Sequence, residues 1–275
     1  MGIIRLSFII PLYNAEPYIV TCLERILACD LPEEEYEVIV WNDGSKDSGA
    51  DVVAQLSLRH SCVRLFSDEN HGVSYARNRA LSMAQGEYVW FVDADDMVVS
   101  QQILPILTKA EQSRADMLTF RWQAFDGYNY SPGLYPVNDM DTPVSGKSLF
   151  CQQRLMMSPW CYLYRRAFLS EHNLTFPENY NTCEDIQFNQ KAFYWAQRVV
   201  ATASVAYTYR LQASSASQGK KQTQKVLKDQ LRRVWPELCY FLPLGAWRYS
   251  ARVVWLNLRE IAFWNLKLIR ALGHS

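Results

Sequence analysis

Short apolar runs without polar alternation recur along the first 120 residues, separated by segments whose apolar residues fall at helical spacing. Such runs are typical of strands buried on both faces, and the helical spacing indicates amphipathic helices. The predicted strands are residues 6–12, 36–41, 63–66, 88–92 and 117–122, and the predicted helices are 18–28, 49–58, 74–83 and 103–112. This alternation predicts a doubly wound α/β fold with a mostly parallel central sheet.

The remainder of the chain has a less regular pattern. Residues 126–145 are rich in turn formers and are expected to form a long loop. Helices are then expected near 147–153 and over 185–196, a short segment at 160–164, and strands at 199–203 and 205–210. Residues 214–222 are polar and contain glycine, which suits a linker. We therefore expect a main domain over residues 1–217 and a helical C-terminal extension over residues 218–275.

The most specific polar cluster is Val92-Asp93-Ala94-Asp95-Asp96, at the end of the strand predicted over 88–92. Side chains alternate along an extended chain, so Asp93 and Asp95 can point the same way. Two adjacent carboxylates repel unless a cation lies between them, and Mg²⁺ or Mn²⁺ prefers oxygen ligands. The alternative is a solvated acidic turn that caps a helix. The apolar run that precedes the cluster favours a functional site.

Two further clusters follow predicted strands, where ligands gather in sheets of this kind. Asp43 precedes a glycine turn, and its carboxylate could accept a hydrogen bond from a nucleobase imide. The alternative, which these residues alone favour, is an Asx turn with Asp47 or Ser48 as a helix cap. The first strand ends in Pro11-Leu12-Tyr13-Asn14, where Tyr13 could stack on a base. The absence of glycine there disfavours a phosphate-cradling loop and a nucleotidyltransferase.

Together these segments resemble glycosyltransferase family 2, whose members have the GT-A fold. The matching segments are residues 8–14, 42–48, 70–78 and 86–96, and Glu184-Asp185-Ile186-Gln187-Phe188 is similar to the family's Glu-Asp motif. The resemblance covers about residues 1–215, which would form the nucleotide-sugar transferase domain. It implies inverting transfer of a hexosyl or N-acetylhexosaminyl group from a nucleoside-diphosphate sugar, expected to be a UDP-sugar. The implied acceptor is a hydroxyl of a glycan or lipid-linked molecule, as in surface polysaccharide synthesis.

The resemblance also implies residue roles. Tyr13 would stack on uracil, Asp43 would bind its imide edge and Arg77 would lie near the phosphates. Asp93 would hold the ribose, and Asp95 would bind the divalent cation, Mn²⁺ or Mg²⁺. The full set of implied donor-binding residues is Pro11, Tyr13, Asn14, Asp43, Arg77, Asp93, Ala94, Asp95 and Arg210.

The resemblance places the acceptor side later in the chain. Asp185 would deprotonate the acceptor hydroxyl, with Glu184 as the second choice. The alternative for Asp185 is a charge at a helix start, stabilised by the helix dipole. Trp160 would stack on an acceptor sugar, although the lysine of the family's Trp-Asn-Lys-Leu-like stretch is missing here. Arg210 would clamp the diphosphate or merely cap a strand.

Charge sets the C-terminal extension apart from the rest of a chain whose formal net charge is zero. Residues 218–275 hold eleven Lys and Arg against three Asp and Glu, a balance of +8. They also hold four tryptophans: Trp235, Trp247, Trp255 and Trp264. Basic helices with tryptophan can lie in an anionic membrane interface. The alternatives are packing on the main domain or on a second subunit as a homodimer, and nucleic acid is not expected as a partner.

The remaining features bear on location. Seven scattered cysteines without metal-ligand spacing suggest thiols in a reducing compartment. The first residues are too quickly polar for a signal peptide, and no apolar stretch reaches 18 residues. We therefore expect a cytoplasmic protein, which would be peripheral on the inner face of the membrane in the alternative where the extension binds lipid. The rival functions are a nucleotidyltransferase that makes nucleotide sugars and a non-catalytic interaction protein with the same fold.

Overall fold

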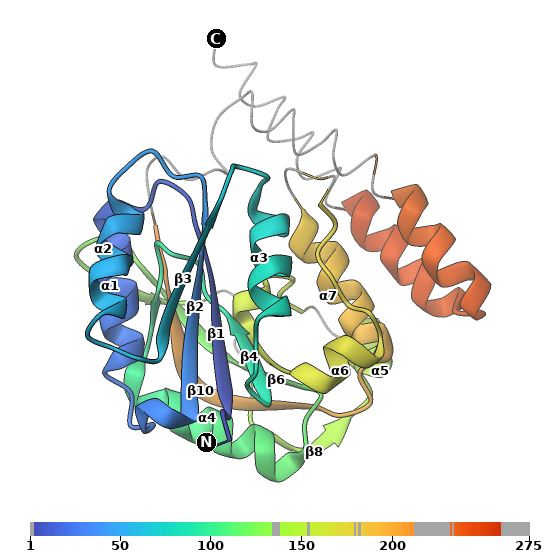
Figure 1. The fold of residues 1–275 in the computed structure, drawn as a ribbon. Coiled ribbons are helices and arrows are strands. Elements are labelled where there is room, and N and C mark those ends of the chain that lie inside the picture. The colour runs from blue at the N-terminus through green and yellow to red at the C-terminus, as the bar shows by residue number, and fades with distance from the viewer. Residues whose placement is uncertain are drawn as a thin grey trace.

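The computed structural model describes residues 3–133, 138–152, 155–178, 180, 183–211, 232 and 234–259. One mixed sheet forms its centre, with strand order β3-β2-β1-β4-β9-β6-β10-β5, β7 beside β6 and β8 beside β10 (Figure 1). The strands are β1 (Leu6–Leu12), β2 (Tyr36–Asp43), β3 (Val63–Asp68), β4 (Tyr88–Phe91), β5 (Met97–Val98), β6 (Met117–Phe125), β7 (Tyr130–Pro132), β8 (Met140–Val144), β9 (Tyr162–Arg165) and β10 (Val199–Arg210).

Helices flank this sheet and connect its strands. They are α1 (Glu16–Leu27), α2 (Gly49–Ser57), α3 (Val73–Ser82), α4 (Ser100–Ser113), α5 (Gly146–Gln152), α6 (Arg166–Glu171) and α7 (Glu184–Trp195). Short 3-10 turns lie at η1 (Glu33–Glu35), η2 (Pro159–Cys161) and η3 (Leu242–Leu244). None of the helices within the described ranges has the length and apolarity needed to cross a bilayer.

Strand direction determines which loops meet. Strands β3, β2, β1 and β4 are parallel, and β9 is antiparallel to both β4 and β6, so β6 and its parallel neighbour β10 run in the same sense as β4. The carboxyl ends of β1, β2, β4, β6 and β10 therefore share one edge of the sheet. The predicted parallel arrangement is confirmed for β3-β2-β1-β4 and for β6-β10, whereas β5, β7, β8 and β9 pair antiparallel to their neighbours.

Several predicted boundaries were wrong. Within residues 126–145, expected to be a loop, the described part contains β7 and β8, which are short pairings at the sheet margin. The two strands expected over 199–210 form one strand, β10, whose register shifts between Ala201 and Val205. Helix α6 and the two-residue strand β5 were not predicted, because elements this short show too little periodicity to detect. The predicted linker at 214–222 lies outside the described residues.

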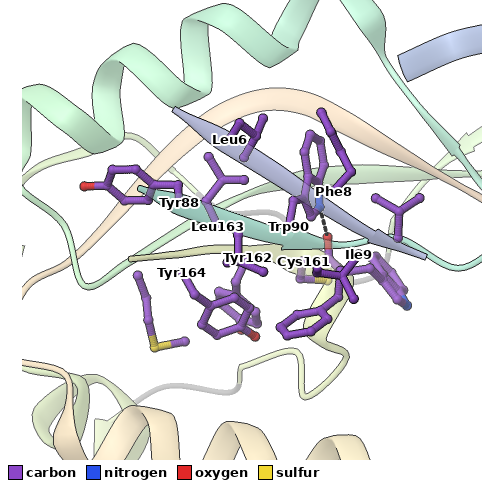
Figure 2. Close-up of a cluster of buried hydrophobic side chains, with 14 of the residues drawn as sticks. Leu6, Phe8, Ile9, Tyr88, Trp90, Cys161, Tyr162, Leu163 and Tyr164 are labelled. Carbon is purple, nitrogen blue, oxygen red and sulfur yellow. Dashed lines mark hydrogen bonds between the residues drawn. The ribbon is translucent and has the colours of Figure 1, made fainter. Parts of the chain in front are cut away.

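A layer of large side chains holds the middle of the sheet together (Figure 2). Phe8 of β1, Trp90 of β4 and Tyr162 of β9 are each at most 1% exposed. The Trp90 indole N–H donates to the Trp160 carbonyl at 2.9 Å, which satisfies the polar group that this ring brings into the core. At Gly86, just before β4, a Cβ atom would lie 2.6 Å from the Ser7 backbone nitrogen, so glycine allows β4 to enter beside β1.

The described part of the C-terminal extension forms helices over 234–241 and 247–259 that lie beside α5 and α7 (Figure 1). The Tyr249 ring stacks on Phe150 of α5 at 4.5 Å, and its hydroxyl donates to the Gln190 carbonyl of α7. The Trp195 indole donates to the Tyr240 hydroxyl at 2.8 Å. The extension is helical here, as predicted, and it packs on the main domain. The division into two domains at residue 217 stays a prediction.

Candidate functional site

A cavity of about 300 Å³ opens where β1 and β4 end. Its wall contains seven of the predicted donor-binding residues, together with Ala15, Tyr18 and Val73. The seven are Pro11, Tyr13, Asn14, Arg77, Asp93, Ala94 and Asp95. Asp43 and Arg210 lie outside this lining. Asp43 is hydrogen-bonded to the turn before α3, and Arg210 to the Asp95 carbonyl. The structure therefore brings together segments 82 positions apart in the chain, as the shared sheet edge requires.

The loops after β1 and β2 are joined by hydrogen bonds. The Asn14 side-chain oxygen accepts from the Lys46 backbone N–H at 2.8 Å, and the Asn14 N–H donates to the Ser45 hydroxyl at 3.1 Å. Asn14 has a φ of 49°, a left-handed conformation that asparagine tolerates better than most residues. Tyr13, next to it, is 51% exposed, so its ring is available at the mouth of the cavity.

Asp43 has a structural role in addition to the one that the resemblance implies. Its carboxylate accepts from the backbone N–H groups of His71 at 2.8 Å and Gly72 at 2.9 Å, and the residue is 3% exposed. Gly72 has a φ of 96°, which glycine adopts without strain. Asp43 thus fixes the turn that starts α3. Contact with a nucleobase stays a prediction that would need a remaining lone pair of this carboxylate.

Arg77 of α3 connects this cavity to the Glu-Asp motif. Its guanidinium donates to Asp93 at 2.8 Å and to Glu184 at 3.1 Å, and the residue is 5% exposed. Burial alone would lower the pKa of Arg77, but the carboxylates of Asp93 and Glu184 raise it above its ordinary value. The guanidinium also lies over the Phe176 ring, 5.2 Å from its centroid. Arg77 is therefore a fixed positive charge on the cavity wall.

Asp96 and Tyr207 form a buried hydrogen-bonded pair, which the sequence analysis did not identify. The Asp96 carboxylate accepts from the Tyr207 hydroxyl at 2.8 Å and from the Arg210 backbone N–H at 2.7 Å. Burial, followed by the charges of Asp93 and Asp95, raises the pKa of Asp96 well above its ordinary value. The sequence showed Asp96 only as part of an acidic run. Its partner comes from β10, 111 residues further along.

Arg210 is held above the same loop by these contacts. Its Nε donates to the Asp95 carbonyl at 2.9 Å, and its guanidinium lies 5.3 Å from the ring centroid of Tyr18, which lines the cavity. A second ring, Phe125 of β6, lies 5.6 Å away. Of the two alternatives for Arg210, these contacts favour a charge aimed at the cavity margin over a strand cap.

Glu184 and Asp185 begin α7 after Cys183, whose φ is 65°. Glu184 is 9% exposed and pairs with Arg77, whereas Asp185 is half-buried and accepts from the Ile186 backbone N–H at 2.8 Å. Glu184 is thus the more buried of the two and is held by Arg77. Asp185 stays the first choice for proton transfer as a prediction.

Trp160 is less accessible than its predicted role requires. It is 6% exposed, and its ring stacks on Tyr207 at 4.5 Å with an interplanar angle of 9°. Tyr209 lies 5.8 Å away at 19°. One face of the indole is thus covered by its neighbours. Direct stacking of Trp160 on an acceptor sugar stays a prediction.

A divalent cation fits this site only together with a substrate. Within the described ranges, no group of three or more His, Cys, Asp or Glu side chains could hold a metal ion by itself. Asp93 and Asp95 nevertheless line the cavity, and Asp93 is already paired with Arg77. Magnesium commonly binds through one or two carboxylates plus substrate phosphates. The residues present therefore fit a cation that Asp95 holds and a diphosphate completes.

Known relatives match most of this chain. The model of glycosyl transferase family 2 matches residues 7–172. The uncharacterized glycosyltransferase EpsJ of Bacillus subtilis is 33% identical over 77% of this chain and 62% of its own length. The Staphylococcus aureus poly(ribitol-phosphate) beta-N-acetylglucosaminyltransferase TarS is 28% identical over 74% of this chain and 35% of its own length. The chain thus spans less than two thirds of either relative.

Solved structures agree with the fold. Residues 1–349 of S. aureus TarS in complex with UDP superpose with a TM-score of 0.68 at 25% identity, covering 83% of this chain and 66% of that one. The mannosyltransferase PcManGT of Pyrobaculum calidifontis, in complex with GDP-Man and Mn²⁺, gives 0.63 at 18% identity over 98% and 79%, which shows the fold alone. The predicted GT-A-like α/β fold is confirmed, and the chain belongs to glycosyltransferase family 2.

Proposed function

We propose that this chain transfers a sugar, with inversion, from a UDP-sugar to a hydroxyl of a glycan or lipid-linked acceptor in surface polysaccharide synthesis. The observation that carries the proposal is the Arg77 bridge, which joins Asp93 in the donor cavity to Glu184 beside Asp185. Donor and base residues are thereby held in one rigid arrangement. The UDP in the TarS complex supports the choice of nucleotide.

In this mechanism Asp185 takes the proton of the acceptor hydroxyl, which is a weak nucleophile at neutral pH. Direct attack on the anomeric carbon breaks the bond to the diphosphate and inverts the configuration. Arg77 and Arg210 lie where they can attract the leaving diphosphate. A bound Mn²⁺ or Mg²⁺, held by Asp95, would offset the negative charge that develops there.

Two rival functions make different predictions. A nucleotidyltransferase would release pyrophosphate from a nucleoside triphosphate and a sugar phosphate, and we expect none here. A non-catalytic relative would bind donor without turnover, whereas we expect metal-dependent hydrolysis of the donor even without acceptor. Family membership and the intact acidic residues support transfer over both rivals.

We also propose that the chain works at the cytoplasmic face of an anionic membrane, where a lipid-linked acceptor would be found. The exposed tryptophans of the C-terminal extension support this partner: Trp235, Trp247 and Trp255 are 71%, 73% and 49% exposed. The alternative is that the same surface forms the contact between two copies of the chain in a homodimer.

The donor site is tested by calorimetric titration of UDP with and without Mn²⁺. Asp95→Ala should remove the gain in UDP affinity that Mn²⁺ provides, about tenfold or more, because the cation loses its protein ligand. Asp51→Ala, on the exposed side of α2, is the matched control and should keep that gain. Equal Mn²⁺-dependent affinity in wild type and Asp95→Ala would contradict the assignment.

A further inference from the structure

Three residues on neighbouring strands form a row of side-chain contacts near the donor cavity. In the register of the sheet, Arg210 of β10 lies opposite Phe125 of β6, and Phe125 lies opposite Tyr130 of β7. Residues paired in register project from the same face of a sheet, so neighbouring side chains in this row can touch. The Tyr130 ring stacks on Phe125 at 4.7 Å, and the Arg210 guanidinium lies 5.6 Å from the Phe125 ring centroid.

Tyr18 of α1 places a second ring against the same guanidinium. Its ring centroid lies 5.3 Å from the Arg210 guanidinium carbon, and Tyr18 lines the donor cavity. A guanidinium is attracted electrostatically to an aromatic face within about 6 Å. The rings of Tyr18 and Phe125 therefore restrict the Arg210 guanidinium to a position at the margin of the cavity.

Two hydrogen bonds fix the remainder of Arg210 to the acidic loop after β4. Its backbone N–H donates to the Asp96 carboxylate at 2.7 Å, and its Nε donates to the Asp95 carbonyl at 2.9 Å. The bonds of Arg210 within the described ranges thus use the backbone and Nε, which leaves both terminal nitrogens open to a ligand. Those two nitrogens form the planar fork that binds pairs of phosphate oxygens.

A role as a strand cap does not account for these contacts. The cap would need only the backbone N–H of Arg210, whereas the side chain is oriented by two rings and by a carbonyl. Two of the three contacting residues, Tyr18 and Asp95, line the donor cavity. The third, Phe125, lies outside that lining and can affect a bound donor only through other residues.

We propose that Tyr18 and Phe125 are positioning residues that hold the Arg210 guanidinium against the diphosphate of the nucleotide-sugar donor. This inference rests on the proposed transferase function. It assigns the two rings to recognition of the phosphates, not of the base or the sugar. Tyr130, which stacks on Phe125, keeps that ring in place from the edge strand β7.

The test compares UDP affinity, measured by calorimetry with Mn²⁺, with uridine affinity, measured by ligand-observed NMR, on the full chain. Tyr18→Leu and Phe125→Leu, which remove a ring and keep an apolar side chain, should each weaken UDP binding about three- to tenfold. Uridine has no phosphate and should bind these variants like the wild type. Phe125→Tyr, which keeps the ring, should retain UDP affinity. Tyr128→Leu is the matched control, because Tyr128 lies in the turn between β6 and β7 and is 91% exposed.

A double-mutant cycle with Arg210→Ala separates action through Arg210 from direct contact with the donor. Arg210→Ala should weaken UDP binding at least as much as either ring variant, and adding Tyr18→Leu or Phe125→Leu to it should cause little further loss. Losses that add to that of Arg210→Ala, an equal loss of uridine affinity, or unchanged UDP affinity in Phe125→Leu would each overturn the inference while the donor site stands. A wild type that binds no UDP would overturn the donor site itself and this inference with it.

Discussion

Arg77 occupies a position that lysine could not serve. Its planar fork reaches Asp93 with one terminal nitrogen and Glu184 with the other, whereas an ammonium is a single point charge. The ion pairs leave a buried positive charge balanced by two carboxylates on different elements. Because an unbalanced buried charge is costly, these three residues must be ordered together. The consequence is that Arg77 links the cavity lining directly to the Glu-Asp motif.

The first prediction concerns the two acidic residues that begin α7. Asp185→Asn should lower the rate of sugar transfer by about 10²-fold or more, the usual contribution of a general base, while UDP affinity changes only a few-fold. Glu184→Gln, its matched neighbour, should weaken the ion pair with Arg77 and lower thermal stability, yet retain more transfer than Asp185→Asn. Rates are measured with UDP-sugar and a glycan acceptor, and affinity by calorimetry. If Glu184→Gln abolishes transfer and Asp185→Asn does not, Glu184 is the base.

At the residue scale, sequence patterns identified the residues that line the cavity, but not the buried contacts behind them. Tyr13, Arg77, Asp93 and Asp95 stand in motifs close to the ends of strands, so local sequence is enough to find them. The burial of Asp96 depends on Tyr207, a residue on a strand 111 positions away, and no local pattern reveals such a pairing. The burial of Trp160 under Tyr207 was missed for the same reason.

At the scale of the elements, strands with a clear local pattern were predicted, and strands without one were divided or missed. The strand expected over 6–12 agrees with β1, because a continuous apolar run bounded by polar residues indicates a buried strand. Strand β10 was divided in two because its irregular middle, between Ala201 and Val205, interrupts the pattern. Strands β7 and β8 were missed because each consists of exposed or half-buried residues at the sheet margin.

The second prediction concerns the contact between the extension helices and α7. Glu237 is 2% exposed, accepts from the Asn257 amide at 2.6 Å and lies against Gln190 of α7. Glu237→Ala removes this buried acceptor and its hydrogen bond with Asn257, so the free energy of unfolding should fall by about 1–3 kcal/mol. Glu24→Ala, at an exposed position of α1, is the control and should change it little. Equal urea midpoints for the two variants would show that the buried contact adds no stability.

At the scale of the whole molecule, helix 247–259 is apolar on two opposite faces. Tyr249 and Val253 face the main domain and are at most 3% exposed, whereas Trp247 and Leu258 are 73% and 59% exposed. Arg252 and Arg259 lie over the ring of Trp255, at 4.6 and 5.2 Å. The inner face explains why the extension packs on the domain. Arg252 also donates to the Phe150 carbonyl of α5 at 3.3 Å, so it joins the two faces. The outer face thus places tryptophan beside arginine, a combination suited to the interface of an anionic membrane.

Removing the extension would not test this surface cleanly. Truncation before residue 218 would expose Phe150 and Tyr194, which pack on Tyr249, and would therefore destabilise the domain itself. Substitutions on the outer face avoid this problem because they leave the inner contacts unchanged.

The third prediction is that this outer face binds anionic vesicles. Each basic residue near such a surface contributes about 1 kcal/mol, and the extension carries a balance of +8. Full-length protein should therefore co-sediment with phosphatidylglycerol vesicles at low salt and be released at high salt, where charges are screened. The double variant Trp247→Ala, Trp255→Ala should bind markedly less, while Tyr128→Ala, which removes an exposed aromatic ring elsewhere, should bind like the wild type. UDP affinity should be the same in all of them. Protein that stays in the supernatant at low salt would reject the membrane, and concentration-dependent dimerisation lost in the double variant would assign the surface to a second copy of the chain.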